Sequence, residues 1–285
     1  MLRDRSTALV EAVHKADRMV SADAPDGVHD LRVALRRTRS LLVTFRPALA
    51  HLEAERLRGE LRWTGRELGG PRDVEVVYGQ LEALLGGAGV GHVSGAAVAL
   101  IQDEARAAHR QAFSLVAALR KGERFRGLLE DLDRLPAEVP VEDPPPDVVR
   151  RRLRKDWRRL RRRIALVDGS PGGAAAREAA LHDVRKAAKR ARYAAETLTP
   201  LFGPRAEHIA DAAQGIQQAL GDHRDTLLTT PVLRRLGARA DLNVDDGAAF
   251  GRMHALEQAR GETALDAYAR AVHQVERPTL GNWLS

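Results

Sequence analysis

Residues 28–39 read Val28-His29-Asp30-Leu31-Arg32-Val33-Ala34-Leu35-Arg36-Arg37-Thr38-Arg39. A closely similar stretch begins 153 residues later and reads Leu181-His182-Asp183-Val184-Arg185-Lys186-Ala187-Ala188-Lys189-Arg190-Ala191-Arg192. A second pair follows at an offset of 152 residues, with Leu68-Gly69-Gly70-Pro71-Arg72-Asp73 in the first half and Leu220-Gly221-Asp222-His223-Arg224-Asp225 in the second. Two matching blocks in the same order indicate an internal duplication.

Both copies of the longer block have the pattern of an amphipathic helix. At about 100° per residue, the histidine and the cations of each copy gather on one side and the apolar residues on the other. The first stripe consists of His29, Arg32, Arg36 and Arg39, opposite Leu31, Ala34, Leu35, Thr38, Leu41, Leu42 and Phe45. The second stripe consists of His182, Arg185, Lys186, Lys189 and Arg192, opposite Val184, Ala187, Ala188, Ala191, Ala194, Ala195 and Leu198. We expect each helix to bury its apolar face.

Most of the remaining sequence also has a helical period, and the strict alternation that is typical of strands is absent. The pattern predicts helices at residues 2–21, 27–50, 52–68, 72–86, 93–120, 123–134, 147–167, 174–199, 204–220, 223–236 and 246–275. The Pro-rich segment 136–146 is expected to be a linker, because proline interrupts helices. We therefore predict an all-α fold, a duplicated antiparallel helical bundle. Its single domain (1–285) would have two four-helix-type halves, 1–135 and 147–285, related by pseudo-twofold symmetry.

The composition favours an acidic partner. The 285 residues include 46 Lys and Arg against 39 Asp and Glu, which gives a formal net charge of +7 and a pI of about 10.3. Such a balance favours nucleic acid, polyphosphate or an anionic membrane as a partner. The chain has no cysteine, which excludes disulfides and thiolate chemistry. It shows no signal-peptide pattern and no apolar run of about 18 residues, so we expect a cytoplasmic protein without a membrane partner.

The two stripes suit a multivalent anion. Like charges at positions i and i+4 destabilise a helix by roughly 0.2–0.5 kcal/mol per pair, and each repeat has only one acid, Asp30 or Asp183, in its first turn. A phosphate-rich chain lying along the stripe would remove this repulsion, because guanidinium groups match phosphate oxygens. Nearby phosphate would also favour protonation of His29 and His182. The alternatives are a solvated basic face and histidines that only support neighbouring helices.

The repeated His-Asp motif, Phe45 near the end of the first helix and the later Leu-Gly-x-x-Arg-Asp motif together resemble the CHAD family, the conserved histidine α-helical domain. The resemblance covers essentially the whole chain. It implies two four-helix bundles related by pseudo-symmetry and a basic central cavity or surface that binds inorganic polyphosphate. Association with polyphosphate granules is a further expectation, because some members associate with storage granules. The expected polyphosphate-binding residues are His29, Arg32, Arg36, Arg37, Arg39, Arg62, Arg66, His182, Arg185, Lys186, Lys189, Arg190, Arg192 and Tyr193.

The two stripes are not equal. Val33 stands where the second half has Lys186, and Ser40 stands where it has Tyr193. A tyrosine hydroxyl can donate to a phosphate oxygen. We therefore expect the second stripe to hold a ligand more strongly than the first.

Other cations flank the repeats. Arg58, Arg62 and Arg66 share one helical face, which forms either a basic wall beside the site or an exposed face. Residues 150–163 are the densest charge run, and their cations either extend the anion surface or are simply solvated. The two Arg-Asp pairs of the shorter block, 72–73 and 224–225, are expected to begin helices, with the acids capping or pairing locally.

These observations favour non-catalytic binding of inorganic polyphosphate or another phosphate-rich polyanion. The first alternative is non-specific nucleic-acid binding, with nucleic acid otherwise a weaker competitor, although the 4% aromatic content argues against base stacking. The second alternative is a phosphotransfer or phosphohydrolase protein that uses His29 or His182 as a nucleophile. No phosphate-binding glycine loop and no convincing metal spacing occur in the sequence. We expect no enzyme activity, catalytic residue, metal or cofactor.

Overall fold

A computed structural model of the chain describes residues 1–46, 48–49, 54–87, 89–140, 142–167, 173–239 and 242–284. Over these residues the chain forms helices and no strand, which confirms the predicted all-α class. Ala, Leu and Arg favour helix, and apolar residues recur every three or four positions, so each helix has one face to bury.

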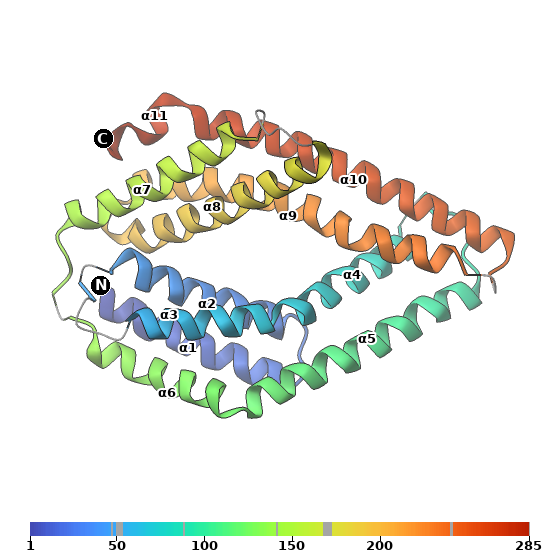
Figure 1. Cartoon of the computed structure of the whole chain (residues 1–285), viewed down its shortest axis with the longest axis horizontal. Coiled ribbons are helices and arrows are strands. Elements are labelled where there is room, and N and C mark those ends of the chain that lie inside the picture. Colours follow the sequence, from blue (N-terminus) through green and yellow to red (C-terminus); the bar gives the residue numbers. More distant parts are fainter. Residues whose placement is uncertain are drawn as a thin grey trace.

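The helices form two groups that lie side by side (Figure 1). The N-terminal group consists of α1 (Leu2–Ser21), α2 (Gly27–Thr44), α3 (Ala54–Glu67), α4 (Gly69–Leu85), α5 (Gly95–Lys121) and α6 (Glu123–Glu138). The C-terminal group consists of α7 (Pro146–Ala165), α8 (Gly173–Phe202), α9 (Pro204–Gly237), α10 (Val244–Glu276), α11 (Pro278–Gly281) and a 3-10 turn, Asn282–Leu284. The rotation expected to relate the two halves stays a prediction.

The prediction of two helices around the second Leu-Gly motif is wrong. Residues 204–220 and 223–236 belong to one continuous helix, α9. In the first half the chain does break at Leu68, between α3 and α4. Pro71 has no N–H, and its ring cannot continue the preceding helix. His223 stands where the first half has Pro71, so nothing interrupts α9.

Several predicted boundaries also shift. Helix α2 ends at Thr44 rather than at residue 50, because the proline at position 47 disfavours helix in the residue before it; residues 47 and 50 lie outside the described part. Helix α6 continues through Pro136 to Glu138. The following helix, α7, already begins at Pro146. The predicted linker 136–146 is therefore too long at both ends.

A large apolar cluster confirms the predicted buried faces of both repeats. It includes Leu31 and Leu35 of α2 and Ala191 and Leu198 of α8. Helices α2 and α8 also pack against each other. Since the apolar face of each repeat is turned into its own group, the opposite, cationic faces lie toward the contact between the groups.

A smaller apolar cluster joins the groups at the other end of the molecule. Helices α4 and α5 extend away from their own group and meet α9 and α10 at the right of the view in Figure 1. The cluster consists of Val77, Leu81, Leu84, Val90, Ala97, Ile101, Leu233, Leu236, Ala249, Phe250 and Met253. The two groups therefore meet at α2 and α8 and again at this end, which fixes the position of the cationic faces between them. In the described part of the chain, no helix is long and apolar enough to cross a bilayer.

Candidate functional site

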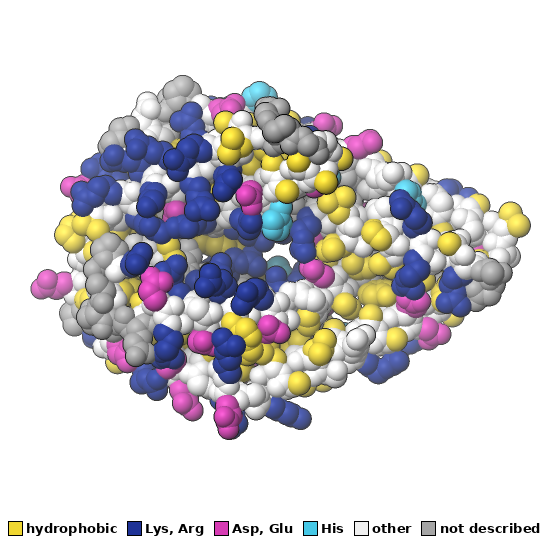
Figure 2. Space-filling model, in the orientation of Figure 1, with side chains coloured by type: hydrophobic (Ala, Val, Ile, Leu, Met, Phe, Trp, Pro, Cys, Tyr) yellow, Lys and Arg dark blue, Asp and Glu magenta, His cyan; other side chains and the backbone are white. Residues whose placement is uncertain are grey.

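The two cationic stripes face each other across the space between α2 and α8. Arg36 of α2 lies close enough to Arg185 and Lys189 of α8 for its charge to lower the pKa of both side chains. Arg32 of α2 acts on Lys189 in the same way. Figure 2 shows a hollow near the middle of this face with Lys and Arg side chains around it. We call this the cationic cleft and define it by Arg32, Arg36, Arg39, Arg185, Lys189 and Arg224.

The pKa values show how crowded the cations are. Burial, followed by the charges of Arg36, Arg185, Arg32 and Arg224, lowers the pKa of Lys189 to about 6. Burial and then Arg36 lower the pKa of Arg32 to about 10. Each shift means that the charged form is held at a free-energy cost in the empty cleft. An anion in the cleft would remove part of that cost.

Glycines lie close to the first arginine of each stripe. The Arg32 Nη1 donates a hydrogen bond to the Gly65 carbonyl at 3.0 Å. A Cβ added at Gly69 would lie 3.3 Å from the same Nη1, and a Cβ added at Gly221 would lie 3.6 Å from Nη2 of Arg185. Gly69 therefore makes room for Arg32, whereas at Gly221 an added Cβ would be in ordinary contact with Arg185. Each half of the sequence contains one longer and one shorter block, but the sequence does not show that these two blocks are in contact.

The wall expected from α3 forms in part. Burial lowers the pKa of Arg39, and the charges of Arg36, Arg62, Arg58 and Arg190 add to this effect. Arg58 and Arg62 thus border the cleft. Arg58 is also paired with Glu55 at 2.5 Å. Arg66 is exposed, and no described contact connects it with the cleft.

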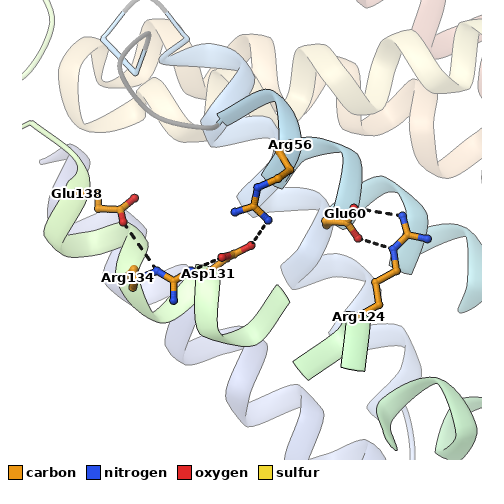
Figure 3. A network of polar contacts seen from close by, with 6 residues as sticks. All are labelled: Arg56, Glu60, Arg124, Asp131, Arg134 and Glu138. Carbon is orange, nitrogen blue, oxygen red and sulfur yellow. Dashed lines mark hydrogen bonds and ion pairs between the residues drawn. The ribbon is translucent and has the colours of Figure 1, made fainter. Parts of the chain in front are cut away.

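The opposite face of α3 is neutralised by α6 (Figure 3). Arg56 pairs with Asp131 at 2.6 Å, and Glu60 accepts two hydrogen bonds from Arg124, at 2.6 and 3.2 Å. Asp131 also accepts a hydrogen bond from Arg134, which lies 4.0 Å from Glu138. The helix packing therefore sorts the cations of α3, because Arg56 has an acidic partner on α6 whereas Arg62 faces the cleft.

Helix α7 adds cations and a buried acid. Leu153, Trp157, Leu160 and Ile164 form its buried face. Asp156 is only 2% exposed, and its carboxylate lies 2.6 Å from Nε of Arg190. Burial raises the pKa of Asp156, while Arg190 and then Arg152 oppose that shift. Nothing in the sequence pattern indicates that Asp156 is buried or that it pairs with Arg190, since it stands inside the densest basic run.

The outward face of α7 carries a separate row of cations. It consists of Arg151, Lys155, Arg158 and Arg162, all exposed. No acidic partner for these four side chains occurs in the described part of the chain. The charge run at residues 150–163 therefore divides into a few residues near the cleft and a solvated row beside it.

Besides Arg190, three of the expected binding residues are paired with acids. Glu196 of α8 pairs with Arg192 at 2.6 Å and with Arg37 of α2 at 3.4 Å. Its backbone carbonyl accepts a hydrogen bond of 3.0 Å from Arg5. Lys186 pairs with Asp183 at 2.5 Å. The contacts that Arg37 and Arg5 make with Glu196 therefore tie the two groups of helices together, whereas the Arg192–Glu196 pair lies within α8.

Tyr193 is also placed differently from the other expected residues. Its side chain is buried, with 4% exposure, and the guanidinium of Arg192 lies 5.5 Å from its ring centroid. The expectation that the second stripe binds more strongly rested on Tyr193 and Lys186. Since one is buried and the other is paired, that ranking loses its basis.

The two histidines stand at the edge of the cationic cleft. Burial and then Arg72 lower the pKa of His29, and burial and then Lys186 lower the pKa of His182. Both rings are thus biased toward the neutral form, and neither has a hydrogen-bonding partner in the described part of the chain. His223 differs, because it lies 3.0 Å from a carboxylate oxygen of Glu178.

The Arg-Asp pairs of the shorter block do not have the same roles. Arg72 lies in the first turn of α4 and pairs with Glu75 at 2.8 Å. Arg224 lies within α9 rather than at a helix start. It donates to both carboxylate oxygens of Asp73 in α4, at 3.2 and 2.9 Å. The prediction that Asp73 pairs locally is wrong, because its partner comes from the other half. Within the described residues, no group of three or more His, Cys, Asp or Glu side chains could hold a metal ion.

Two curated proteins are similar in sequence to almost the whole of this chain. Two uncharacterized proteins of Mycobacterium tuberculosis, from strains CDC 1551 and H37Rv, are each 29% identical to this chain over 275 residues. The match covers 94% of this chain and 52% of each relative, so the chain spans about half the length of these curated relatives.

Two solved structures share the fold. PptA from Streptomyces chartreusis superposes with a TM-score of 0.67 at 23% identity, covering 95% of this chain and 98% of that one. The CHAD domain from the plant Ricinus communis superposes with a TM-score of 0.63 at 22% identity, covering 94% of this chain and 89% of that one. The model of the CHAD domain family matches residues 6–234. The chain therefore belongs to the CHAD domain family, which is known in general for binding polyphosphate.

Proposed function

We propose that this protein binds long inorganic polyphosphate in the cationic cleft and catalyses no reaction on it. The observation that carries the proposal is the close approach of Arg32 and Arg36 to Arg185 and Lys189. Burial and then these charges lower the pKa of Lys189 to about 6. Like charges held this close destabilise the empty protein. A polyanion that reaches all of them at once removes more of this repulsion than a single phosphate can.

The distribution of the cations favours a chain over a compact ligand. They come from α2, α3, α8 and α9, and the pKa of Arg39 shows that the set continues from Arg36 to Arg58 and Arg62. Each contact to a phosphate oxygen is modest by itself, whereas contacts along one chain add without a new loss of translational freedom. Affinity should therefore increase with the length of the polyphosphate and fall steeply with salt.

The chemistry of the cleft supports binding rather than turnover. A histidine nucleophile or general base is usually oriented by a partner group, and His29 and His182 have no such partner in the described part of the chain. The side chains that define the cleft are cations, which stabilise bound phosphate. Membership of a family known in general for polyphosphate binding agrees with this proposal.

Competition binding tests the proposal. Labelled long-chain polyphosphate would be displaced by unlabelled polyphosphate, duplex DNA, RNA, ATP and orthophosphate at physiological salt. We expect polyphosphate to compete far better than the others. Equal competition by DNA or RNA would favour a general nucleic-acid binder, and equal competition by ATP would favour a discrete nucleotide site.

Variants and a turnover assay complete the test. Arg36→Gln/Arg39→Gln should weaken polyphosphate binding, whereas Arg110→Gln/Arg126→Gln, which removes two exposed cations outside the cleft, should not. Incubation of the wild-type protein with polyphosphate and Mg²⁺ should release no phosphate and leave no phosphohistidine. Sustained phosphate release that His182→Ala abolishes would overturn the non-catalytic assignment.

A further inference from the structure

The acids of the two Arg-Asp pairs lie among the cations of the cleft. Asp73 accepts hydrogen bonds from both terminal nitrogens of Arg224, at 3.2 and 2.9 Å. Asp225 is partly buried, and its nearest cationic influences are Arg185, Arg224 and Arg260. The cations of the cleft suit an anionic ligand, and these two carboxylates occupy positions beside the cations that the oxygens of such a ligand would take.

Arg224 belongs to the cleft rather than to its surroundings. Its charge lowers the pKa of Arg32, Arg185, Lys189 and His182, which come from both α2 and α8. Asp73 acts in the opposite direction on Arg32 and Arg185, since its charge raises their pKa values. One carboxylate thus compensates three guanidinium groups in the empty cleft, and it is bound to one of them in a two-pronged pair.

We propose that Asp73 is an internal counter-ion of the cleft, which holds Arg224 in the empty protein and is displaced from it by polyphosphate. The inference rests on the proposed function. A carboxylate presents two oxygens to the guanidinium fork, as a phosphate group does. Once a phosphate group binds Arg224, the Asp73 carboxylate has lost its partner and lies beside a polyanion. Breaking the pair and facing like charge both weaken binding.

This arrangement sets a minimum number of contacts that a ligand must make before it displaces Asp73 from Arg224. An anion that makes few contacts leaves the Asp73–Arg224 pair intact and gains nothing from Arg224. A long chain that already contacts Arg36, Lys189 and Arg185 gains enough from these contacts to displace the carboxylate. Asp73 therefore acts as a specificity-determining residue, although it does not itself bind the ligand.

A double-mutant cycle tests the displacement. Binding of tripolyphosphate and of long-chain polyphosphate would be measured calorimetrically for wild type, Asp73→Asn, Arg224→Gln and the double variant, at fixed pH and salt. We expect Asp73→Asn to tighten binding about threefold to tenfold, the range for a charge-assisted pair that is partly exposed. The gain should be clearly larger with Arg224 present than in the Arg224→Gln background.

The opposite outcomes are equally clear. Unchanged or weaker binding by Asp73→Asn, with the helices intact by circular dichroism, means that Asp73 is a structural residue. An equal gain in both backgrounds means that its charge acts from a distance and that no pair is displaced. If wild type does not bind long-chain polyphosphate, the proposed function fails. If wild type binds but Asp73→Asn is not tighter, only this inference fails.

The chain offers a matched control. Glu104 of α5 accepts hydrogen bonds from both terminal nitrogens of Arg235 in α9, at 2.8 and 2.5 Å, so it also joins the two halves by a two-pronged pair. Its pKa responds to Arg235, Arg239 and Tyr78 and to none of the cations that define the cleft. Glu104→Gln and Asp73→Asn should both lower the melting temperature. Glu104→Gln should bring no gain in affinity for polyphosphate. Asp73→Ser provides a second removal of the carboxylate should the amide not fold.

Discussion

Polyphosphate binding should be coupled to the uptake of a proton by Lys189. In the empty protein, burial and four neighbouring arginines lower the pKa of this ammonium group to about 6. At pH 7, roughly one-tenth of the Lys189 side chains are then charged. A polyanion in the cleft supplies opposite charge and restores a pKa near the ordinary value of about 10.4. The bound protein is therefore expected to carry about 0.9 proton more than the free protein at pH 7.

This difference fixes the pH dependence of both binding and stability. Between pH 7 and 9, the binding constant should fall close to tenfold for each unit of rising pH, because free protein must gain a proton to bind. The free energy of unfolding of the empty protein should change in the other direction. Since the folded pKa of Lys189 is depressed, the unfolded chain binds more protons between about pH 6 and 10, and the Lys189 contribution to stability rises with pH there.

Calorimetry in buffers of different ionisation enthalpy measures the proton directly. The observed binding enthalpy should depend on the buffer with a slope of about one proton at pH 7.5 in wild type. Lys189→Met should abolish this slope and flatten the affinity between pH 7 and 9. Lys121→Met, at an exposed lysine in the last turn of α5, should leave both unchanged. A wild-type affinity that does not vary with pH, or a slope that survives in Lys189→Met, would refute the reasoning.

Three further predictions follow from the contacts. Glu196→Gln should lower the free energy of unfolding by about 1–2 kcal/mol in urea denaturation, because it leaves Arg192 without its acid. The affinity for polyphosphate should not decrease, and a large loss of affinity would mean that Glu196 belongs to the binding site. Arg36→Ala should weaken binding more than Lys186→Ala in the same titration, since Arg36 reaches both stripes whereas Lys186 is paired with Asp183; the reverse order would restore the ranking expected from the sequence. Arg158→Gln/Arg162→Gln should weaken the binding of long chains but not of tripolyphosphate, because the outward row of α7 is reached only by a chain that extends beyond the cleft; an equal loss for both ligands would contradict this.

Much of the fold follows from local pattern. The repeated block predicts two amphipathic helices with the correct buried faces, from Leu31 and Leu35 in α2 to Leu198 in α8. Periodicity succeeds here because burial of one helix face depends on residue spacing along that helix alone. The same reasoning fails at Gly221, where the Leu-Gly motif predicts a break between two helices. The glycine lies within the continuous helix α9, beside Arg185.

The cations of the site could be predicted as a set but not as individuals. The repeat and the family resemblance identified Arg32, Arg36, Arg185 and Lys189, which the structure brings together. They also identified Arg37 and Arg192, which Glu196 engages. Whether an arginine is free depends on which acid a distant helix places beside it. The sequence of its own helix has no information on that partner.

The helical class, the two stripes and the excess of positive charge can be predicted from the amino-acid sequence, because each depends on residue type and spacing within one segment. The packing of the helices places the stripes face to face and brings Asp73 to Arg224. It also lowers the pKa of Lys189 by burial. The physical reason is that charge–charge energies depend on distance and on exclusion of water. Both are properties of how α2, α4, α8 and α9 pack, and no single segment contains them.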